Sequence, residues 1–385
     1  MFQHKKRHGS SLKSTGDSTS QTQSSKFPPN HFPPIQAMLN RMDFRKQIGY
    51  ARSIPPETEP ELREIDRLLA QYEKLNPLPR TQLEYEKLAS CLSQLERTVY
   101  LWHSKNMPLE SHRPDERTPA LANLLKTVNS EFDSLFSIAV RRRFDFWYPG
   151  KDKAGLRETR KVEAMWRSVL AEDSSLKVES SIYPPIESAD SSKRPMPSGS
   201  SADFKKRMFT QIGRIMMSRG GRELIDSILE NRHTVTIRGH EGEKYRTKTK
   251  NKKNSQASSP ILDSDPEGPV YEGLGSDATV YSPAVPSRKM KFYFTQSPNP
   301  RYGAYTIVPE YLRLAHELGH AMNAQYGKSR EHFSSKKYGI DIARWTNPEE
   351  KYVIEKIDNP MRRELNLPNR IGHISTGPLL EEYWS

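Results

Sequence analysis

The segment from 305 to 327 constrains the fold of this chain more than any other part of the sequence. Tyr305-Thr306-Ile307-Val308 is β-branched and aromatic, which predicts a short strand. Pro309 fits the first position of a helix, where its missing N–H costs nothing, and Gly327 fits the stop. The apolar residues between them recur at helical spacing: Leu312, Leu314, Ala315, Leu318, Ala321 and Met322. We therefore expect a strand followed by a helix of about 27 Å.

This helix carries the pattern H-E-x-x-H at His316-Glu317-Leu318-Gly319-His320. Residues four apart lie one turn above each other on a helix, so His316 and His320 can direct ring nitrogens at one metal ion. Glu317 is then placed to take a proton from water at that metal, as in zinc proteases. Two ordinary, partly buried histidines are the alternative, but the strand, the helix start and the stop favour a zinc (Zn2+) site.

A catalytic zinc site needs a third protein ligand and one open position. The chain has a single cysteine, Cys91, so the third ligand must be a histidine or a carboxylate. A third histidine in an H-E-x-x-H-x-x-G-x-x-H pattern is excluded, because Gln325-Tyr326 stands where it would fall. The remaining candidates are Glu331, His332, Asp341, Glu349, Glu350, Glu355 and His373.

A predicted helix that opens at Asn347-Pro348 narrows this choice. A carboxylate in its first turn can face the motif helix, which makes Glu350 the first choice as ligand and Glu349 the second. Glu355 lies further along the same helix and is a candidate to orient a ligand histidine. For each of these carboxylates, a solvated surface position is the alternative.

Composition and periodicity divide the chain into four predicted parts. Residues 1–56 form a disordered leader, 57–172 a mainly α-helical region, 173–203 a Ser/Pro-rich linker, and 204–385 a zinc metalloprotease domain with a basic, flexible insertion at about 240–260. The fold class is α+β, with a small zincin-like sheet beside the active-site helix. The expected helices are 57–75, 81–102, 118–143, 161–172, 204–218, 221–230, 309–326 and 347–357, and the expected strands are 233–238, 289–294 and 305–308.

A net charge of +13 favours acidic partners, such as a nucleic acid, an anionic membrane or an acidic protein. The sequence argues against a nucleic acid, because no recognised nucleic-acid module accompanies the charge. The sequence has no run of 18 apolar residues, so we expect no transmembrane helix. The first 26 residues have no apolar core of the secretory type, which argues against an ordinary signal peptide.

The motif region resembles two groups of zinc proteases. His316-Glu-Leu-Gly-His-Ala, with Tyr326-Gly327 at the helix end and a later Glu349-Glu350 pair, is similar to the light chains of clostridial neurotoxins. The resemblance is closer to the NleD-type zinc-protease effectors of Gram-negative pathogens. That resemblance extends over roughly 205–375 and rests on the motif and on Thr346-Asn347-Pro348-Glu349-Glu350, Asp358-Asn359, Arg362, Glu364, Leu367-Pro368, Arg370 and His373.

The resemblance implies a zinc endopeptidase that is delivered by a type III secretion system into a host cell and cleaves a host signalling protein, such as a kinase. Its metal ligands would be His316, His320 and Glu350, and Glu317 would be the general base. The helical region 57–172 lies outside this resemblance and is a candidate to bind a secretion chaperone, a host membrane or the host target. Secretion of this kind suits a Ser-rich leader and needs no classical signal peptide.

Two further roles complete the predicted site. A cationic or phenolic group must stabilise the developing oxyanion, and Tyr352, Arg362, Arg363, Arg370 and His373 are candidates. The family pattern favours Arg370 and His373 as these catalytic residues. The strand 305–308 is a candidate edge for an extended substrate. The competing hypothesis is a non-catalytic binding protein for a host protein, a nucleic acid or a membrane surface, with a vestigial or accidental metal motif.

Overall fold

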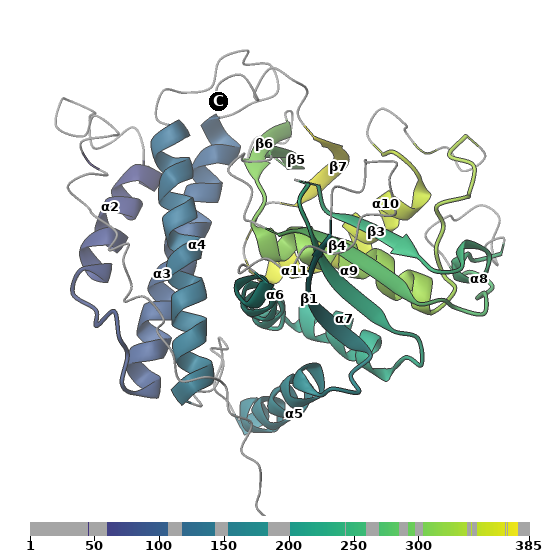
Figure 1. Cartoon of the computed structure of the whole chain (residues 1–385). Helices are drawn as coiled ribbons and strands as arrows, with labels where there is room; N and C mark the ends of the chain where they lie inside the picture. Colours follow the sequence, from purple (N-terminus) through teal and green to yellow (C-terminus); the bar gives the residue numbers. More distant parts are fainter. Residues whose placement is uncertain are drawn as a thin grey trace, which may run out of the picture. The chain divides into compact units, whose positions relative to one another are not determined.

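The computed structural model has an α+β fold with a four-stranded sheet, a three-stranded sheet and several helices (Figure 1). The predicted leader, apart from Arg45, lies outside the described residues. These are residues 45, 60–106, 118–142, 153–183, 201–242, 244–258, 269–284, 292–296, 303–336, 340, 345–365, 367 and 369–375. No helix among them is long and apolar enough to cross a membrane.

Three helices of the N-terminal region pack side by side: α2 (Pro60–Tyr72), α3 (Gln82–Asn106) and α4 (Thr118–Arg142) (Figure 1). The predicted apolar stripe of α2 is buried at Leu62, Ile65, Leu68, Leu69 and Tyr72. It packs in the same core as the stripes of α3 and α4. Helical periodicity therefore predicted this region well.

The expected linker is wrong in its first part. A fourth helix, α5 (Lys153–Leu170), leads into strand β1 (Leu176–Tyr183), which pairs in parallel with β2 (Val235–His240). Leu176 and Val178 are buried against the core, so the segment contributes to the main sheet. The Ser-rich composition of the segment concealed a strand whose stability comes from pairing with a distant partner.

The main sheet has the strand order β1-β2-β4-β3. Strand β4 (Ala278–Pro283) runs parallel to β2, and its other neighbour, β3 (Arg246–Thr249), is antiparallel to it at the sheet edge. Helix α6 (Ser201–Ile215) and the motif helix α9 (Glu310–Gln325) contact this sheet. Buried Val235, Ile237 and Val280 belong to the core that these helices share.

The predicted flexible insertion at about 240–260 is also wrong. Strand β3 and the short helix α8 (Lys252–Ser255) give it regular structure, and β3 contacts α9 directly. Its basic residues alternate with less exposed ones, which is the period of a strand with one packed face. A high local charge therefore did not prevent sheet formation.

Helix α7 (Arg219–Glu230) begins where the sequence suggested a break. Ser218 caps its N-terminus by accepting a hydrogen bond from the Gly221 backbone N–H. A Cβ atom at Gly221 would lie 1.9 Å from the Ile215 carbonyl oxygen, so only glycine allows this close approach. Glu364 accepts a second hydrogen bond from the Gly220 N–H at 2.9 Å. Gly220 and Gly221 thus lie in the first turn of α7.

The second sheet is antiparallel, with the order β6-β5-β7. Its strands are β5 (Phe292–Gln296), β6 (Gly303–Ile307) and β7 (Arg370–Ser375). Sequence patterns predicted the first two strands and missed β7. Strand β6 leads directly into α9, as expected, although Pro309 is the residue before the helix and not its first residue.

The helix that was expected at 347–357 belongs to a longer helical segment, which continues to Glu364 and has three consecutive parts. These are α10 (Pro348–Val353), a π-helical turn η1 (Ile354–Asp358) and α11 (Asn359–Glu364). Asn347 caps the first of them by accepting from the Glu350 N–H at 2.9 Å. The turn η1 contacts both α9 and β7, so this region joins the motif helix to the second sheet.

The helical region and the motif helix share a buried polar contact. Arg214 of α6 pairs with Glu96 of α3 at 3.0 Å and donates a hydrogen bond to Asn129 of α4. The same guanidinium lies over the rings of Phe132 and Tyr311, the latter in the first turn of α9, at 4.5 and 4.1 Å. Residues 37–385 accordingly form one unit, without a boundary at 173–203.

Candidate metal centre

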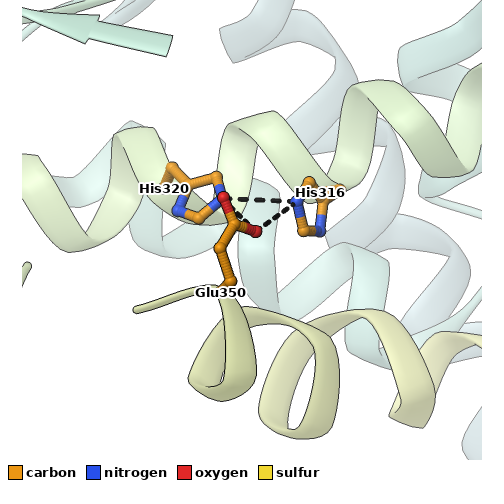
Figure 2. A group of neighbouring side chains, drawn as sticks. All are labelled: His316, His320 and Glu350. Atoms are coloured by element: carbon orange, nitrogen blue, oxygen red, sulfur yellow. Dashed lines mark hydrogen bonds and ion pairs between the residues drawn. The ribbon is translucent and has the colours of Figure 1, made fainter. Parts of the chain in front are cut away.

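The predicted metal ligands converge on one point between α9 and α10. His316 and His320 extend from one face of α9, and Glu350 points toward them from the first turn of α10 (Figure 2). His316 Nε2 lies 3.1 Å from Glu350 Oε2, and His320 Nε2 lies 3.3 Å from the same oxygen. The two Nε2 atoms are 3.3 Å apart. The third-ligand prediction of Glu350 therefore agrees with the geometry of the cluster.

These distances fit a metal ion with short bonds to nitrogen and oxygen. In a tetrahedral zinc site with bonds of about 2.0–2.1 Å, neighbouring ligand atoms are about 3.3–3.4 Å apart. Two imidazole nitrogens and one carboxylate oxygen also form a ligand set that suits zinc. The cluster could thus hold a metal ion through three protein ligands.

Gly319 allows the two helices to approach closely beside this cluster. A Cβ atom there would lie 2.9 Å from Ile357 Cδ1 and 3.0 Å from Val353 Cγ1. These two side chains belong to the helical segment that carries Glu350. A glycine between the ligand histidines therefore helps to bring the carboxylate within reach.

Charge within the cluster shifts two of its pKa values in opposite directions. Burial opposes the ionised form of Glu350, but the Coulomb attraction of His320 and the hydrogen bonds from both histidines hold its pKa well below the usual value. Burial likewise opposes the charged form of His320, but Glu350 and Glu349 raise its pKa well above the usual value. The site is therefore organised around a carboxylate anion that attracts positive charge.

Glu349 is not in the cluster and instead orients His320. Its Oε1 lies 3.3 Å from His320 Nδ1 and accepts a hydrogen bond from Asn323 Nδ2 at 2.8 Å. Its Oε2 accepts a hydrogen bond from the Arg330 backbone N–H at 2.7 Å. Hydrogen bonding at Nδ1 leaves Nε2 of the imidazole for a metal.

Asp358 is the corresponding carboxylate for His316, and sequence reasoning gave it no role. Its Oδ2 lies 3.9 Å from His316 Nδ1 and accepts from Arg370 Nη1 at 2.9 Å. Arg362 pairs with the other oxygen at 3.4 Å. Burial opposes ionisation of Asp358, but Arg362 and Arg370 lower its pKa. This buried anion stabilises the side of His316 that faces away from the cluster.

The π-helical turn explains how Asp358 faces the same way as Glu350. In a regular α-helix, the eight residue-to-residue steps from Glu350 to Asp358 would span about 2.2 turns and leave the two side chains about 80° apart. The π turn takes up about one extra residue, which restores two full turns. Both carboxylates consequently face α9. Sequence periodicity cannot show this irregularity, because a π turn depends on packing.

The predicted orienting role of Glu355 is wrong, because its carboxylate pairs with Lys351 at 3.2 Å on the helix surface.

Arg370 is buried, and its Nη1 lies 3.5 Å from His316 Nδ1, behind the ligand ring. This position suits a residue that supports His316 better than one that touches substrate. The side-chain amide of Asn359 holds the Arg370 backbone: its Oδ1 accepts a hydrogen bond from the Arg370 N–H at 2.8 Å, and its Nδ2 donates to the Arg370 carbonyl oxygen at 2.9 Å.

His373 lies beside the cluster, with Nε2 at 3.4 Å from Glu350 Oε2 and Nδ1 at 2.5 Å from Thr346 Oγ1. Its ring stacks on His316 at 6.1 Å between centroids. Burial is the largest cause that lowers its pKa to about 4; Glu350 opposes this shift, and His316 and Arg370 act in the same direction as burial. A neutral, partly exposed imidazole therefore borders the metal cluster, and the predicted catalytic role of His373 stays a prediction.

The structure separates the other candidates from the cluster. Glu331 pairs with Lys252 at 3.6 Å, and His332 packs against Phe333, both on exposed positions. Tyr352 is covered by the Arg330 guanidinium at 3.8 Å, and Arg363 is exposed. Arg362 is buried against Asp358. Asp341 lies outside the described residues.

Glu317 has a partner that sequence reasoning missed. Its carboxylate Oε2 accepts a hydrogen bond from Thr247 Oγ1 of β3 at 2.7 Å, and the same hydroxyl lies 2.9 Å from the Glu317 carbonyl oxygen. The edge strand thus holds the glutamate of the H-E-x-x-H pattern. The alternating threonines of Arg246-Thr247-Lys248-Thr249 are the only trace of this contact in the sequence.

A comparison with protein-family models, curated proteins and solved structures finds no match to the chain. The assignment of this site therefore depends on its own residues.

Proposed function

We propose that the protein is a zinc-dependent endopeptidase with a zincin-like catalytic domain. The observation that carries the proposal is the convergence of His316 Nε2, His320 Nε2 and Glu350 Oε2 at separations of 3.1 to 3.3 Å. The partly exposed Glu317 follows His316 directly on the same helix. Two ligand histidines, a ligand carboxylate and an adjacent general base are the components that zinc peptidases require.

In the proposed reaction, His316, His320 and Glu350 hold the metal ion. Zinc at this position would supply Lewis acidity, lowering the pKa of water and polarising the scissile carbonyl group. Glu317 takes a proton from the attacking water and returns it to the leaving amine. Thr247 holds the Glu317 carboxylate, while Glu349 and Asp358 fix the two imidazoles. His373, which is partly exposed beside the cluster, would stabilise the developing oxyanion of the substrate.

Strand β3 is the favoured site for an extended substrate. It is the edge strand of the main sheet and touches Glu317 through Thr247. The sequence points to 305–308 for this role, and β6 does lie at an edge of the second sheet, but α3 contacts it. Addition of a peptide strand to β3 would bring its backbone beside the general base.

Family resemblance extends the proposal to a host signalling protein as substrate and to delivery through a type III secretion system. Several residues of that resemblance make structural contacts in this chain. Asp358 lies behind His316 and pairs with Arg370 and Arg362. Asn359 binds the backbone of β7 at Arg370, and Glu364 accepts a hydrogen bond in the first turn of α7. This agreement supports the proposed relationship.

The test combines metal analysis with digestion of a complex peptide mixture. The purified chain should contain one zinc ion and cleave internal peptide bonds, and a chelator should abolish cleavage. Glu317→Gln should lose activity by at least about a hundredfold while it keeps its zinc, since a general base contributes roughly that much or more. His320→Ala should lose the zinc itself.

Glu355→Gln is the matched control, because Glu355 lies close to Glu350 in sequence but pairs with Lys351. It should keep both zinc and activity. A chain that binds zinc but cleaves no peptide in the mixture would favour the non-catalytic alternative. Undiminished cleavage by Glu317→Gln would refute the proposed mechanism.

A further inference from the structure

One side of β3 and its flanks carries a row of cationic side chains. These exposed side chains alternate with half-buried ones that face α9. Tyr245 donates a hydrogen bond to Glu310 of α9, and Thr247 donates one to Glu317. The cations are Lys244, Arg246, Lys248 and Lys250. Because side chains alternate along a strand, these four lie on the face that points away from α9.

Two of these cations are available to a partner. Lys250 already pairs with Asp277 at 3.5 Å. Lys248 lies 5.6 Å from the Tyr281 ring centroid, and neither it nor Arg246 has a carboxylate within ion-pair distance in the part of the chain that the structure describes. Arg246 and Lys248 are therefore the two open cations, separated by one residue.

The free edge of β3 shows which backbone groups a partner strand would meet. The Lys250 N–H donates to the Asp277 carbonyl at 2.8 Å, and the register pairs Lys248 with Thr279 and Arg246 with Tyr281. In an antiparallel ladder every second residue directs its peptide groups at its partner. Arg246, Lys248 and Lys250 thus bond toward β4, while the peptide groups of Thr247 and Thr249 point to the free edge.

A peptide that pairs with this edge presents its side chains alternately to the two faces of the sheet. On one face they approach α9 and Glu317. On the other face they lie beside Arg246 and Lys248, where opposite charges form favourable cross-strand pairs. Carboxylates would make such pairs only if they were separated by one residue.

We propose that this surface selects extended peptides with acidic residues, aspartate or glutamate, at every second position. The inference rests on the proposed endopeptidase function and specifies its substrate class. A polypeptide is favoured over a nucleic acid because the cations border a hydrogen-bonding strand edge that also contacts Glu317. The preference is set by Arg246 and Lys248 together.

Binding to the Glu317→Gln chain tests this selection separately from catalysis. Two fluorescent peptides of identical composition would be compared, one with Glu-x-Glu and the other with Glu-x-x-Glu in the same neutral, β-prone sequence. The first places both carboxylates on one face and the second places them on opposite faces. We expect the Glu-x-Glu peptide to bind roughly two- to fivefold more tightly at low salt, as one additional cross-strand ion pair predicts.

Arg246→Gln/Lys248→Gln should remove this difference. The matched control is Lys74→Gln/Lys87→Gln, which lowers the net charge equally at exposed positions of the helical region and should retain the difference. Equal binding of the two peptides, or a difference that survives Arg246→Gln/Lys248→Gln, would overturn the inference. So would an oligothymidylate that binds more tightly than either peptide and depends on the same two residues.

Cleavage by the unmodified chain gives a separate readout. If it cleaves both peptides equally, the proposed function stands and the selection fails. If the Glu317→Gln chain distinguishes the two peptides but the unmodified chain cleaves neither of them and no peptide of the complex mixture, the selection stands as a binding preference and the proposed function fails.

Discussion

Replacement of Glu96 by glutamine should destabilise the whole protein, although Glu96 lies in the N-terminal helical region. Its carboxylate contacts Arg214 Nη2 at 3.0 and 3.2 Å, with both side chains buried. Arg214 also contacts α4 through Asn129 and lies over Tyr311 of the motif helix. Glu96→Gln would leave that buried guanidinium without its counter-charge.

The size of the effect follows from the geometry. At 3.0 Å and an effective dielectric constant of about 20, the attraction between the charges is about 5.5 kcal/mol. Removal of one partner from a buried pair costs roughly 3–5 kcal/mol. Because glutamine still accepts a hydrogen bond and Asn129 remains, we expect the lower end, about 3 kcal/mol of unfolding free energy.

Arg214→Met should lower the unfolding free energy by less than Glu96→Gln does. Burial raises the pKa of Glu96 and Arg214 opposes that shift, so without the cation the carboxyl can take up a proton and become neutral. An arginine that loses its carboxylate has no such response, because it stays charged. Methionine also keeps much of the apolar contact with Phe132 and Tyr311.

Urea unfolding followed by tryptophan fluorescence and circular dichroism measures these losses. Glu163→Gln is the control, because it removes the same charge from an exposed pair with Arg167, 3.3 Å long, that is worth about 0.5 kcal/mol or less. If the unfolding free energy of Glu96→Gln came within 1 kcal/mol of that of the unmodified chain, the pair would not couple the helical region to the part of the chain that carries the metal cluster. A single transition at lower urea, seen by both probes, is the expected result.

Three further predictions concern the site and the pH dependence of stability. Thr247→Val removes the hydroxyl that holds Glu317 and should lower kcat/KM about tenfold with zinc retained, whereas Thr247→Ser should stay near normal; equal rates would contradict the assigned role. Asp358→Asn should weaken zinc binding roughly 10- to 100-fold in a chelator competition, and Glu355→Gln should not. Burial raises the pKa of Glu131 to about 7, so its protonation stabilises the fold below about pH 4.5 and that stability is lost as the pH rises through 7. Glu131→Gln should therefore flatten this part of the pH profile of unfolding free energy, and an unchanged slope would refute the assignment.

Local sequence patterns predicted the elements whose periodicity and end signals lie within one segment of the chain. The stripe of α2 and the run from β6 through α9 to Gly327 follow from periodicity and end signals, and Gly327 does adopt a positive φ of 64°. His316 and His320 could be predicted as a pair because their spacing places them on one face of a helix. Glu350 could be predicted because Asn347-Pro348 marks a helix start, which places this carboxylate in the first turn.

Features that depend on distant partners could not be predicted from local sequence patterns. Strand β1 stands at the start of a Ser/Pro-rich segment, and β3 alternates cations with threonine, so the composition around each of them did not indicate a strand. Each is held by pairing with a strand that lies more than 25 residues away. Asp358 reaches His316 only through a π turn and two buried arginines. Tertiary packing decided all three.

Helix α9 is the element on which all parts of the proposed site depend. The spacing of its two histidines is intrinsic to the helix, but the position of Glu350 relative to them is set by packing of the η1 turn against Gly319. The orientation of Glu317 depends on β3, and Tyr311 depends on Arg214 and hence on the helical region. The H-E-x-x-H pattern therefore supplies two ligands and a base, whereas the third ligand and the orientation of the base require the rest of the fold. For this reason a fragment that begins at the predicted domain boundary at 204 would lack β1 and the partner of Arg214, and would hold its metal ligands less well than the full chain.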